Sequence, residues 1–349
     1  MLKKKTIFIF LLSLIFILSS SFVAAEFMEH CGDHVVRVYD EDGNYIFATA
    51  RGVVRGDRYI STDNIEYVIE EASDDRATAV KKGEIDLLQG ITELRVPYHY
   101  SQDEERVVAI YHTHNGESYE PSEAAVEGPG DIHEVGRELA SALENLGVRV
   151  VHNENLHLPH DGASYERSRA TAMEVSEEMP HVVLDLHRDG IPDPGEYLTE
   201  IDGETISQVR LVIGRQNPNS SVNDQFARQL KAAADEIYPG LVRDIFFGRG
   251  NYNQSISPNS VLLEFGTHTT TKEQAIASAH LLAEPLINIL YGEEASAQRG
   301  RSAYASIPWI IGLLVVGILI FLFINEGSWE GVVNRLKNFI PNEMGKKKD

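Results

Sequence analysis

The chain has 349 residues, of which 43% are hydrophobic, enough for one large globular domain or for a large domain and a small one. Its 53 acidic residues outnumber the 31 basic residues, and this excess excludes nucleic acid as a partner, because phosphates require a basic surface. Cys31 is the single cysteine, so any metal must be held by histidine and carboxylate side chains rather than by thiolates.

An apolar segment opens the chain. In residues 1–25, three lysines precede an apolar run that ends in small residues, which is the layout of a secretory signal peptide or signal anchor. We therefore expect the body of the chain to lie outside the cytoplasm. The sequence leaves open whether this segment is cleaved.

Residues 33–100 are predicted to form a small module of short β-strands. Residues 35–39, 44–49 and 59–60 are strand-like and are separated by turn sequences such as EDG at 41–43. No group of residues with an evident chemical role occurs in this part of the chain. The module is therefore predicted to be an adaptor or spacer.

Residues 105–291 alternate between strand-like and helix-like patterns, and we predict that they form the catalytic domain. Strands are expected at 107–111, 148–151, 181–186, 209–213, 245–247 and 261–263, and helices at 132–146, 164–178, 222–238 and 272–290. Nearly continuous apolar strands separated by helices are typical of a sheet that is buried on both sides. The predicted fold class is α/β, with a mostly parallel sheet and helices on both faces.

A second apolar segment lies near the C-terminus, after a small, polar linker at residues 292–306. Residues 307–324 are apolar throughout and long enough, at about 1.5 Å per helical residue, to cross a bilayer as a transmembrane helix. Basic residues follow in residues 325–349, which the positive-inside rule makes a cytoplasmic tail. The sequence thus predicts a cell-membrane protein whose catalytic domain is extracytoplasmic.

Polar residues gather at the ends of three predicted strands of the catalytic domain. They lie in residues 111–119 (YHTHNGESY), 185–189 (DLHRD) and 262–266 (LLEFG). In open α/β sheets the loops at the carboxyl ends of strands meet at one crevice, where ligands bind. We therefore expect these three runs to converge.

His114 and Glu117 have a spacing, H-x-x-E, that lets an imidazole and a carboxylate reach a common point, and His187 would supply a third ligand from a distant strand. Two imidazoles and one carboxylate, with the fourth position left to water, are a ligand set of catalytic zinc. Glu264 ends an apolar strand and is the candidate general base, which would take a proton from water and pass it to the leaving nitrogen.

Alternatives remain open for two ligands. His112 and His114 alternate along a strand end and point to opposite sides, so one of them faces the metal, and His114 is favoured because it heads the H-x-x-E spacing. His112 would then support the ligands or bind substrate. If Glu117 is instead a solvated loop carboxylate, Asp131 or Glu134 would replace it as a ligand.

Arg188 and Glu264 also have two interpretations each. Arg188 could bind a substrate carboxylate through two parallel hydrogen bonds, or it could form a structural ion pair. Glu264 could likewise form an ion pair instead of acting as a base.

Several runs occur in the order that is found in a known family. They are residues 111–119, Val135 with Gly136, residues 164–169 (SYERSR), 185–189, 238–241 (YPGL) and 252–266 (YNQSISPNSVLLEFG). Over residues 105–290 the chain resembles the stage II sporulation protein P family, peptidoglycan amidases and endopeptidases of endospore-forming bacteria. The resemblance implies cleavage of the N-acetylmuramoyl-L-alanine amide bond and of peptide cross-links, dependence on zinc, and partnership with the sporulation proteins D and M during engulfment. Tyr252 and Asn253 open the last run and are predicted to bind substrate.

The expected function is therefore that of a zinc-dependent amidase that acts on peptidoglycan from a membrane tether. A zinc carboxypeptidase acting on wall peptides would use the same ligands and base. A non-catalytic wall-binding scaffold would need neither. The cleavage products distinguish the two enzymes, and replacement of Glu264 distinguishes both from the scaffold.

Overall fold

The computed structural model describes residues 34–90, 106–291 and 322. Residues 34–90 and 106–291 belong to one compact unit. The predicted N-terminal segment, linker, transmembrane helix and tail lie outside the described residues, except for residue 322. In the part that is described, no helix is both long enough and apolar enough to cross a membrane.

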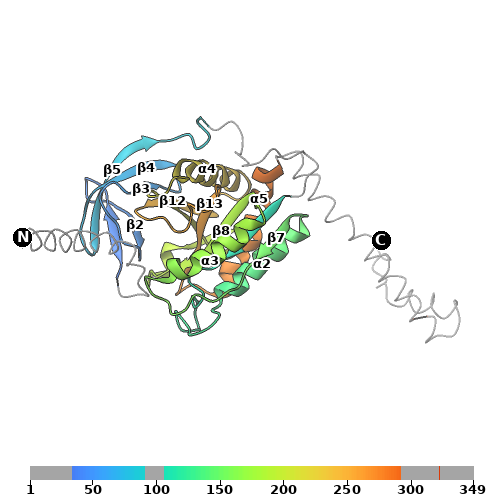
Figure 1. The fold of residues 1–349 in the computed structure, drawn as a ribbon. Helices are drawn as coiled ribbons and strands as arrows, with labels where there is room; N and C mark the ends of the chain where they lie inside the picture. Colours follow the sequence, from blue (N-terminus) through green and yellow to red (C-terminus); the bar gives the residue numbers. More distant parts are fainter. Residues whose placement is uncertain (1–33, 91–105, 292–321, 323–349) are drawn as a thin grey trace, which may run out of the picture. The chain divides into compact units, whose positions relative to one another are not determined.

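A mixed sheet of 11 strands forms the centre of this unit, in the order β2-β1-β5-β4-β3-β12-β11-β13-β8-β6-β7 (Figure 1). In chain order the strands are β1 (Val36–Tyr39), β2 (Tyr45–Thr49), β3 (Arg58–Ile60), β4 (Ile65–Ala72), β5 (Arg76–Glu84), β6 (Val107–Tyr111), β7 (Arg149–His152), β8 (Val182–Asp189), β11 (Val209–Gly214), β12 (Val242–Gly248) and β13 (Ser260–Thr267). A separate hairpin consists of β9 (Leu198–Ile201) and β10 (Glu204–Ser207), which the sequence did not predict. It follows a short 3₁₀ turn in the chain, η1 (Pro194–Glu196).

The strand directions place several carboxyl ends at one edge of the sheet. The strands β13, β8, β6 and β7 run parallel to one another, whereas β11 pairs with β13 in the antiparallel sense. The sheet is therefore less uniformly parallel than the sequence predicted. Because β6, β8 and β13 point the same way, the polar runs that follow or end these strands lie at the same edge.

Helices cover both faces of the sheet, as predicted. The helices are α2 (Ile132–Asn145), α3 (Ser164–Glu177), α4 (Ser220–Ile237) and α5 (Lys272–Tyr291), each within two residues of its predicted bounds. Side chains alternate along β6, so that Val108 and Ile110 pack in the core shared with α2, α4 and α5, whereas Ala109 and Tyr111 pack against α3. The side of the sheet that α3 covers is the side of the candidate site.

The N-terminal β strands differ from the expected separate spacer. The short strand β3 pairs with β12 in the antiparallel sense, with Ile60 opposite Ile245, and so extends the central sheet. Phe47 stacks on Tyr59 with ring centroids 4.0 Å apart and also contacts Phe246 of β12. Without β3, the β12 edge would expose unpaired backbone groups. The module is thus part of the same folded unit.

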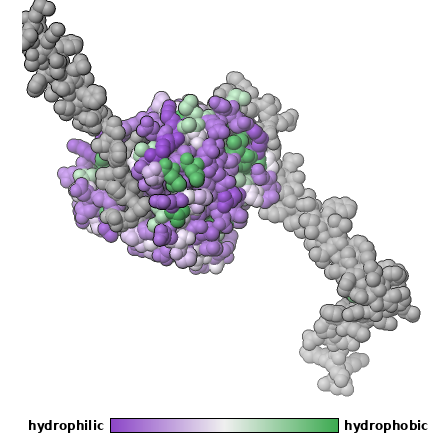
Figure 2. Space-filling view, turned by 60° about the horizontal axis from the view of Figure 1, so that its bottom comes forward, coloured by the Kyte–Doolittle hydropathy of each residue, from purple (hydrophilic) through white to green (hydrophobic). Residues whose placement is uncertain are grey.

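One face of the molecule is mostly hydrophilic. On this face, shown in Figure 2, polar residues dominate and apolar residues form small patches. This agrees with the acidic excess of the chain and with a solvated surface around a large apolar core.

Candidate metal centre

Three predicted ligands come together at the carboxyl edge of the sheet. His114 and Glu117 lie in the loop after β6, and His187 lies near the end of the neighbouring strand β8. Their side chains are buried, with exposed fractions of 3%, 3% and 0%. One ligand atom from each lies within 4.8 Å of those of the other two. The strand β8 continues to Asp189, beyond its predicted end, so His187 sits on a strand instead of a loop.

Each of the two histidines lies close to one oxygen of Glu117. His114 Nδ1 is 3.3 Å from Glu117 Oε1, and His187 Nδ1 is 3.5 Å from Glu117 Oε2. Zinc bonds of about 2.0–2.1 Å in a tetrahedral site place neighbouring ligand atoms about 3.4 Å apart. The two imidazole rings meet at 79°, with centroids 4.9 Å apart. The donor types are those that zinc binds, and each imidazole lies at about this ligand-to-ligand distance from one oxygen of Glu117.

Charge pairing keeps the Glu117 side chain ionised. Burial raises the pKa of Glu117, but His187 and the charged Arg188 outweigh this effect and hold the pKa well below its ordinary value. Burial lowers the pKa of His187, but Asp185 and Glu117 raise it well above its ordinary value. The pocket thus has a carboxylate that is negative over the whole physiological pH range.

A second carboxylate, that of Asp185, lies at the ring nitrogen of His187 that faces away from Glu117. Asp185 Oδ1 lies 3.1 Å from His187 Nε2 and accepts a hydrogen bond from the Thr113 backbone N–H at 2.8 Å. The Thr113 hydroxyl donates to Asp185 Oδ2 at 2.7 Å. With Nε2 directed at Asp185, Nδ1 is left to face Glu117. A carboxylate behind a metal-binding histidine is a common device for fixing the ring orientation.

His112 points away from the ligand group. Its Nε2 lies 2.8 Å from His152 Nε2, and its Nδ1 lies 3.4 Å from the carbonyl oxygen of Leu186. If Nδ1 donates to that carbonyl, Nε2 must accept, so His152 is the donor of the pair. His112 is fully buried, and a Cβ on Gly136 would lie 2.7 Å from its ring. His112 is therefore outside the ligand group, and its predicted role, to support the ligands or to bind substrate, stays a prediction.

The other candidate ligands lie outside the group. Asp131 and Glu134 both contact the ammonium of Lys272, at 3.3 and 2.8 Å. An ion pair at the start of α2 therefore accounts for both carboxylates. Of the three acidic side chains that the sequence left open, Glu117 is the one that joins the histidines.

The Arg188 guanidinium is engaged by the backbone. It donates to the carbonyl oxygens of Ser118 at 3.3 Å and Ala124 at 2.6 Å, and its own backbone N–H donates to Glu117 Oε2 at 2.9 Å. These bonds hold the loop after β6 in place. The guanidinium also lies 4.0 Å from Glu117 Oε1, so the structural ion pair that the sequence left open is present, and binding of a substrate carboxylate stays a prediction.

Glu264 lies on β13, opposite His187 in the parallel pairing of β13 with β8. Its Oε1 accepts a hydrogen bond from Arg51 Nε at 2.7 Å, and its Oε2 accepts one from the Tyr197 hydroxyl at 3.0 Å. The ion pair that the sequence left open is thus present, and the role of general base stays a prediction. Arg51 and Tyr197 were missed, because neither belongs to a motif and each is far from Glu264 in the sequence.

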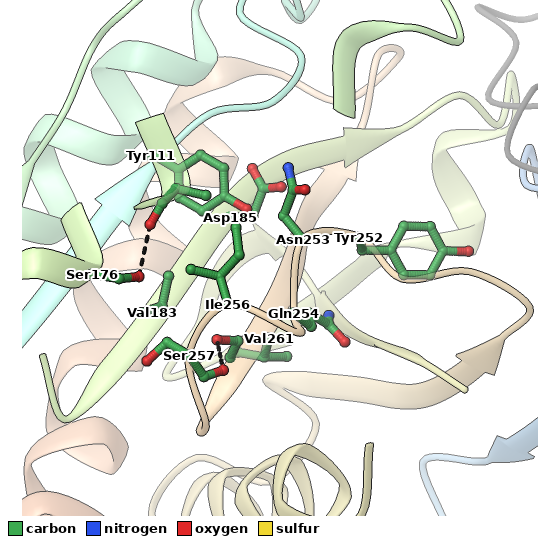
Figure 3. A pocket seen from close by; sticks show the side chains of 12 residues that line it. Tyr111, Ser176, Val183, Asp185, Tyr252, Asn253, Gln254, Ile256, Ser257 and Val261 are labelled. Carbon is green, nitrogen blue, oxygen red and sulfur yellow. Dashed lines mark hydrogen bonds between the residues drawn. The ribbon is translucent and has the colours of Figure 1, made fainter. Parts of the chain in front are cut away.

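A small pocket lies on the α3 side, and Asp185, which lines it, also contacts His187 of the candidate metal centre (Figure 3). Tyr111, Asp185 and Asn253 lie close together at one end of it, and the ring of Tyr252 points away. Asn253 donates to the Tyr165 carbonyl oxygen at 2.9 Å and to the Ser168 hydroxyl at 3.0 Å. Asn253 therefore fixes the start of α3, and no observation here assigns substrate contact to it or to Tyr252.

Two rings from the segment that leads from the loop after β7 into the first turn of α3 pack against His114. The His160 ring stacks on the His114 ring with centroids 4.2 Å apart, and the Tyr165 ring meets it edge-on at 5.4 Å. Tyr165 also stacks over His187 at 6.3 Å. These contacts restrict the orientation of both imidazoles, so this segment forms a wall of the candidate centre.

The fold and this centre define an α/β protein with a candidate zinc site at the carboxyl edge of its sheet. The model of the stage II sporulation protein P family matches residues 53–287, and the chain belongs to this family, as the motifs predicted. Stage II sporulation protein P of Bacillus subtilis (strain 168) is 28% identical over 221 residues, which cover 57% of this chain. The match covers 55% of that protein, so the chain spans about half the length of the curated relative it matches.

Solved structures with partial similarity include cell-wall amidases. The CwlD amidase from Clostridioides difficile, solved in complex with the GerS lipoprotein, is 12% identical with a TM-score of 0.40, covering 54% of this chain and 100% of that chain. The catalytic domain of CwlV, an N-acetylmuramoyl-L-alanine amidase from Bacillus (Paenibacillus) polymyxa, is 15% identical with a TM-score of 0.35, covering 54% and 99%.

Proposed function

We propose that this chain is a zinc-dependent peptidoglycan hydrolase that cleaves the N-acetylmuramoyl-L-alanine amide bond. The observation that carries the proposal is the convergence of His114, Glu117 and His187, which each bring one ligand atom within 4.8 Å of those of the other two. Membership of the stage II sporulation protein P family supports the same activity.

The reaction is the addition of water to an amide. A zinc ion held by the three side chains would supply Lewis-acid chemistry to the scissile carbonyl and to the attacking water. Glu264 would accept a proton from that water and deliver it to the leaving nitrogen as the carbon–nitrogen bond breaks. The products are the carboxylate of the lactyl group and a peptide with a free N-terminal alanine.

The direct test is digestion of purified sacculi by the full chain, with the products identified by mass spectrometry. The proposal predicts intact glycan strands and released peptides with free N-terminal alanine. The variant Glu264→Gln should lower turnover by about 1000-fold, within the range attributed to general acid–base catalysis. Glu236→Gln, an exposed position on α4, is the matched control and should retain full activity.

Two other functions give different results in the same assay. A zinc carboxypeptidase would release single terminal amino acids and leave the muramoyl amide intact. A wall-binding scaffold would release nothing, and its function in cells would survive Glu264→Gln. Either outcome would contradict the amidase proposal.

The cellular setting is also proposed from the sequence and the family. We propose that the chain is anchored in the cell membrane through residues 307–324, with its catalytic domain extracytoplasmic, and acts in wall remodelling such as engulfment. The sporulation proteins D and M would be its partners. Protease accessibility in intact protoplasts, and co-purification of the three proteins from sporulating cells, test these two statements separately.

A further inference from the structure

Arg51 connects the N-terminal β strands to the candidate active site. It follows β2, in the part of the chain that was predicted to be a spacer, and lies outside the family match at 53–287. Its side chain is only 4% exposed and reaches β13, where Nε lies 2.7 Å from Glu264 Oε1. The guanidinium carbon also lies 5.4 Å from the centre of the Tyr252 ring. The two ion-pair partners are 213 positions apart in sequence.

The backbone around Arg51 is attached to the same strand ends. The Ala50 N–H donates to Asp189 Oδ1 at 3.1 Å, and the Ala48 carbonyl oxygen accepts from Arg210 Nη2 at 3.2 Å. Asp189 ends β8, two residues after His187. Residues 48–51 are therefore positioned by the strands that carry the candidate site, and the direction of the Arg51 side chain is fixed.

Both oxygens of Glu264 have assigned partners. Arg51 holds Oε1, and the Tyr197 hydroxyl holds Oε2 at 3.0 Å, with Arg210 Nη1 at 3.8 Å from the same oxygen. A buried ion pair contributes little net stability, because removing two charges from water costs about as much as their attraction returns. Stability therefore does not explain why this ion pair lies next to the candidate metal centre. The pair fixes the direction of the Glu264 carboxylate, and this effect is the better explanation.

We propose that Arg51 is a positioning residue, which holds the Glu264 carboxylate in the orientation needed for proton transfer. This inference rests on the proposed function, in which Glu264 acts as the general base. It makes the N-terminal β strands a part of the active site. In this role Arg51 acts through Glu264.

The test is a double-mutant cycle on the full chain, with Arg51→Met, Glu264→Gln and the double variant. Arg51→Met should lower kcat by about 100-fold, the size of effect that follows a small misplacement of a reacting group, while KM and bound zinc stay unchanged. The double variant should be no slower than Glu264→Gln alone, because Arg51 has no further effect once the base is removed. Arg55→Met, which removes a 79% exposed arginine of the same segment, should leave kcat unchanged.

Two rescue measurements keep the inference falsifiable if Arg51→Met folds poorly. Arg51→Lys keeps the positive charge and should recover part of kcat. Methylguanidine added to Arg51→Ala should raise kcat in a saturable manner, and it should not affect Arg55→Ala. An Arg51→Met enzyme with wild-type kcat, or one whose loss adds in full to that of Glu264→Gln, would overturn the inference, as would a loss of activity that only follows loss of zinc.

The proposed function fails in a different way. If Glu264→Gln keeps full turnover, the general-base role itself is wrong. If Glu264→Gln is inactive while Arg51→Met is normal, the proposed function stands and only the inference about Arg51 falls.

Discussion

Glu117 is the residue on which the candidate centre depends most. Its two oxygens face the two histidines, and Oε2 also accepts the Arg188 backbone N–H. A glutamine at this position would present a neutral group to the ion. If its NH2 group took the place of Oε2, it would face the Arg188 backbone N–H, so that two hydrogen-bond donors would oppose each other. A single atom change would therefore remove a ligand and disturb the loop that carries His114.

The first prediction concerns zinc content. Glu117→Gln should lower the zinc affinity of the full chain by more than about 100-fold, because even partners that only orient ligands are worth about 10- to 100-fold. Glu134→Gln is the control, since Glu134 pairs with Lys272 and not with the histidines. Competition with a zinc chelator measures both. Loss of zinc in Glu134→Gln with retention in Glu117→Gln would show that the wrong carboxylate has been assigned.

A second prediction concerns His181, just before β8 and away from the metal ligands. Burial, reinforced by the charge of Arg106, lowers its pKa to about 4. The unfolded chain takes up a proton near pH 6.5, whereas the folded chain binds it only near pH 4, so acidification between these values favours unfolding. The contribution of His181 to the free energy of unfolding should fall by up to about 3 kcal/mol over this window, because each pH unit between the two pKa values contributes at most about 1.4 kcal/mol.

The matched variant for this effect is His181→Asn. Asparagine keeps an acceptor for the Val107 N–H, which now donates to His181 Nδ1 at 3.2 Å, but it cannot be protonated. Urea denaturation at pH 7 and pH 4.5 should show a smaller pH dependence for the variant than for the wild type. Equal pH dependence in the two proteins would show that His181 is not the group responsible.

At the scale of elements, α2 is packed onto the His112–His152 pair. Gly136 lies where the helix meets these rings, and a Cβ there would be 2.7 Å from His112 and 2.9 Å from His152. The His112 ring is fully buried and lies 2.8 Å from His152 Nε2, so it cannot move away from the helix without breaking this contact. The glycine at position 136 is thus explained by the close packing of α2 on the His112 and His152 rings.

The third prediction follows from this contact. Replacement of glycine by alanine within a helix ordinarily stabilises by about 0.5–1 kcal/mol. At Gly136 the clash should outweigh this gain, and Gly136→Ala should destabilise the protein by about 1–3 kcal/mol, the cost of overpacking. Ser141→Ala, on the exposed side of α2, should change stability little. A Gly136→Ala protein that is more stable than the wild type in urea would contradict the packing described here.

The elements themselves were largely predictable. Apolar periodicity located the four helices, because each buries one continuous face on the sheet. The proximity of His114 and His187 was also predictable. Both come at the end of apolar strands, and because β6 and β8 are parallel, their carboxyl ends lie at the same edge of the sheet. The strands β8 and β13 extend three and four residues beyond their predicted ends. Their polar residues suggested that the strands stop, but Asp189 is buried with Arg210 as its partner and Glu264 is buried with Arg51, so both strands continue.

At the scale of the whole molecule, the sequence could not reveal how the N-terminal strands join the catalytic sheet. The strand β3 has only three residues, and its pairing with β12 bridges a long stretch of chain. No local pattern encodes such a contact. For the same reason Arg51 had no visible signal, although its partner Glu264 was identified from the end of an apolar strand.

The fourth prediction tests this integration. Phe47→Ala should destabilise the unit by about 3–5 kcal/mol, because a buried aromatic side chain is removed from contact with Tyr59 and Phe246. Unfolding should remain a single transition, with loss of zinc and loss of secondary structure at the same urea concentration. Leu88→Ala, at a position that is 50% exposed, is the control. Two separate transitions would indicate an independent spacer domain.

Binding of zinc by the three candidate ligands is tested most directly by X-ray anomalous diffraction at the zinc edge, from crystals of the protein purified without added metal. We expect one strong anomalous peak, bonded to His114, Glu117 and His187 and to no other side chain. A protein that binds no zinc in stoichiometric amount, yet still digests sacculi in the presence of a chelator, would contradict the account.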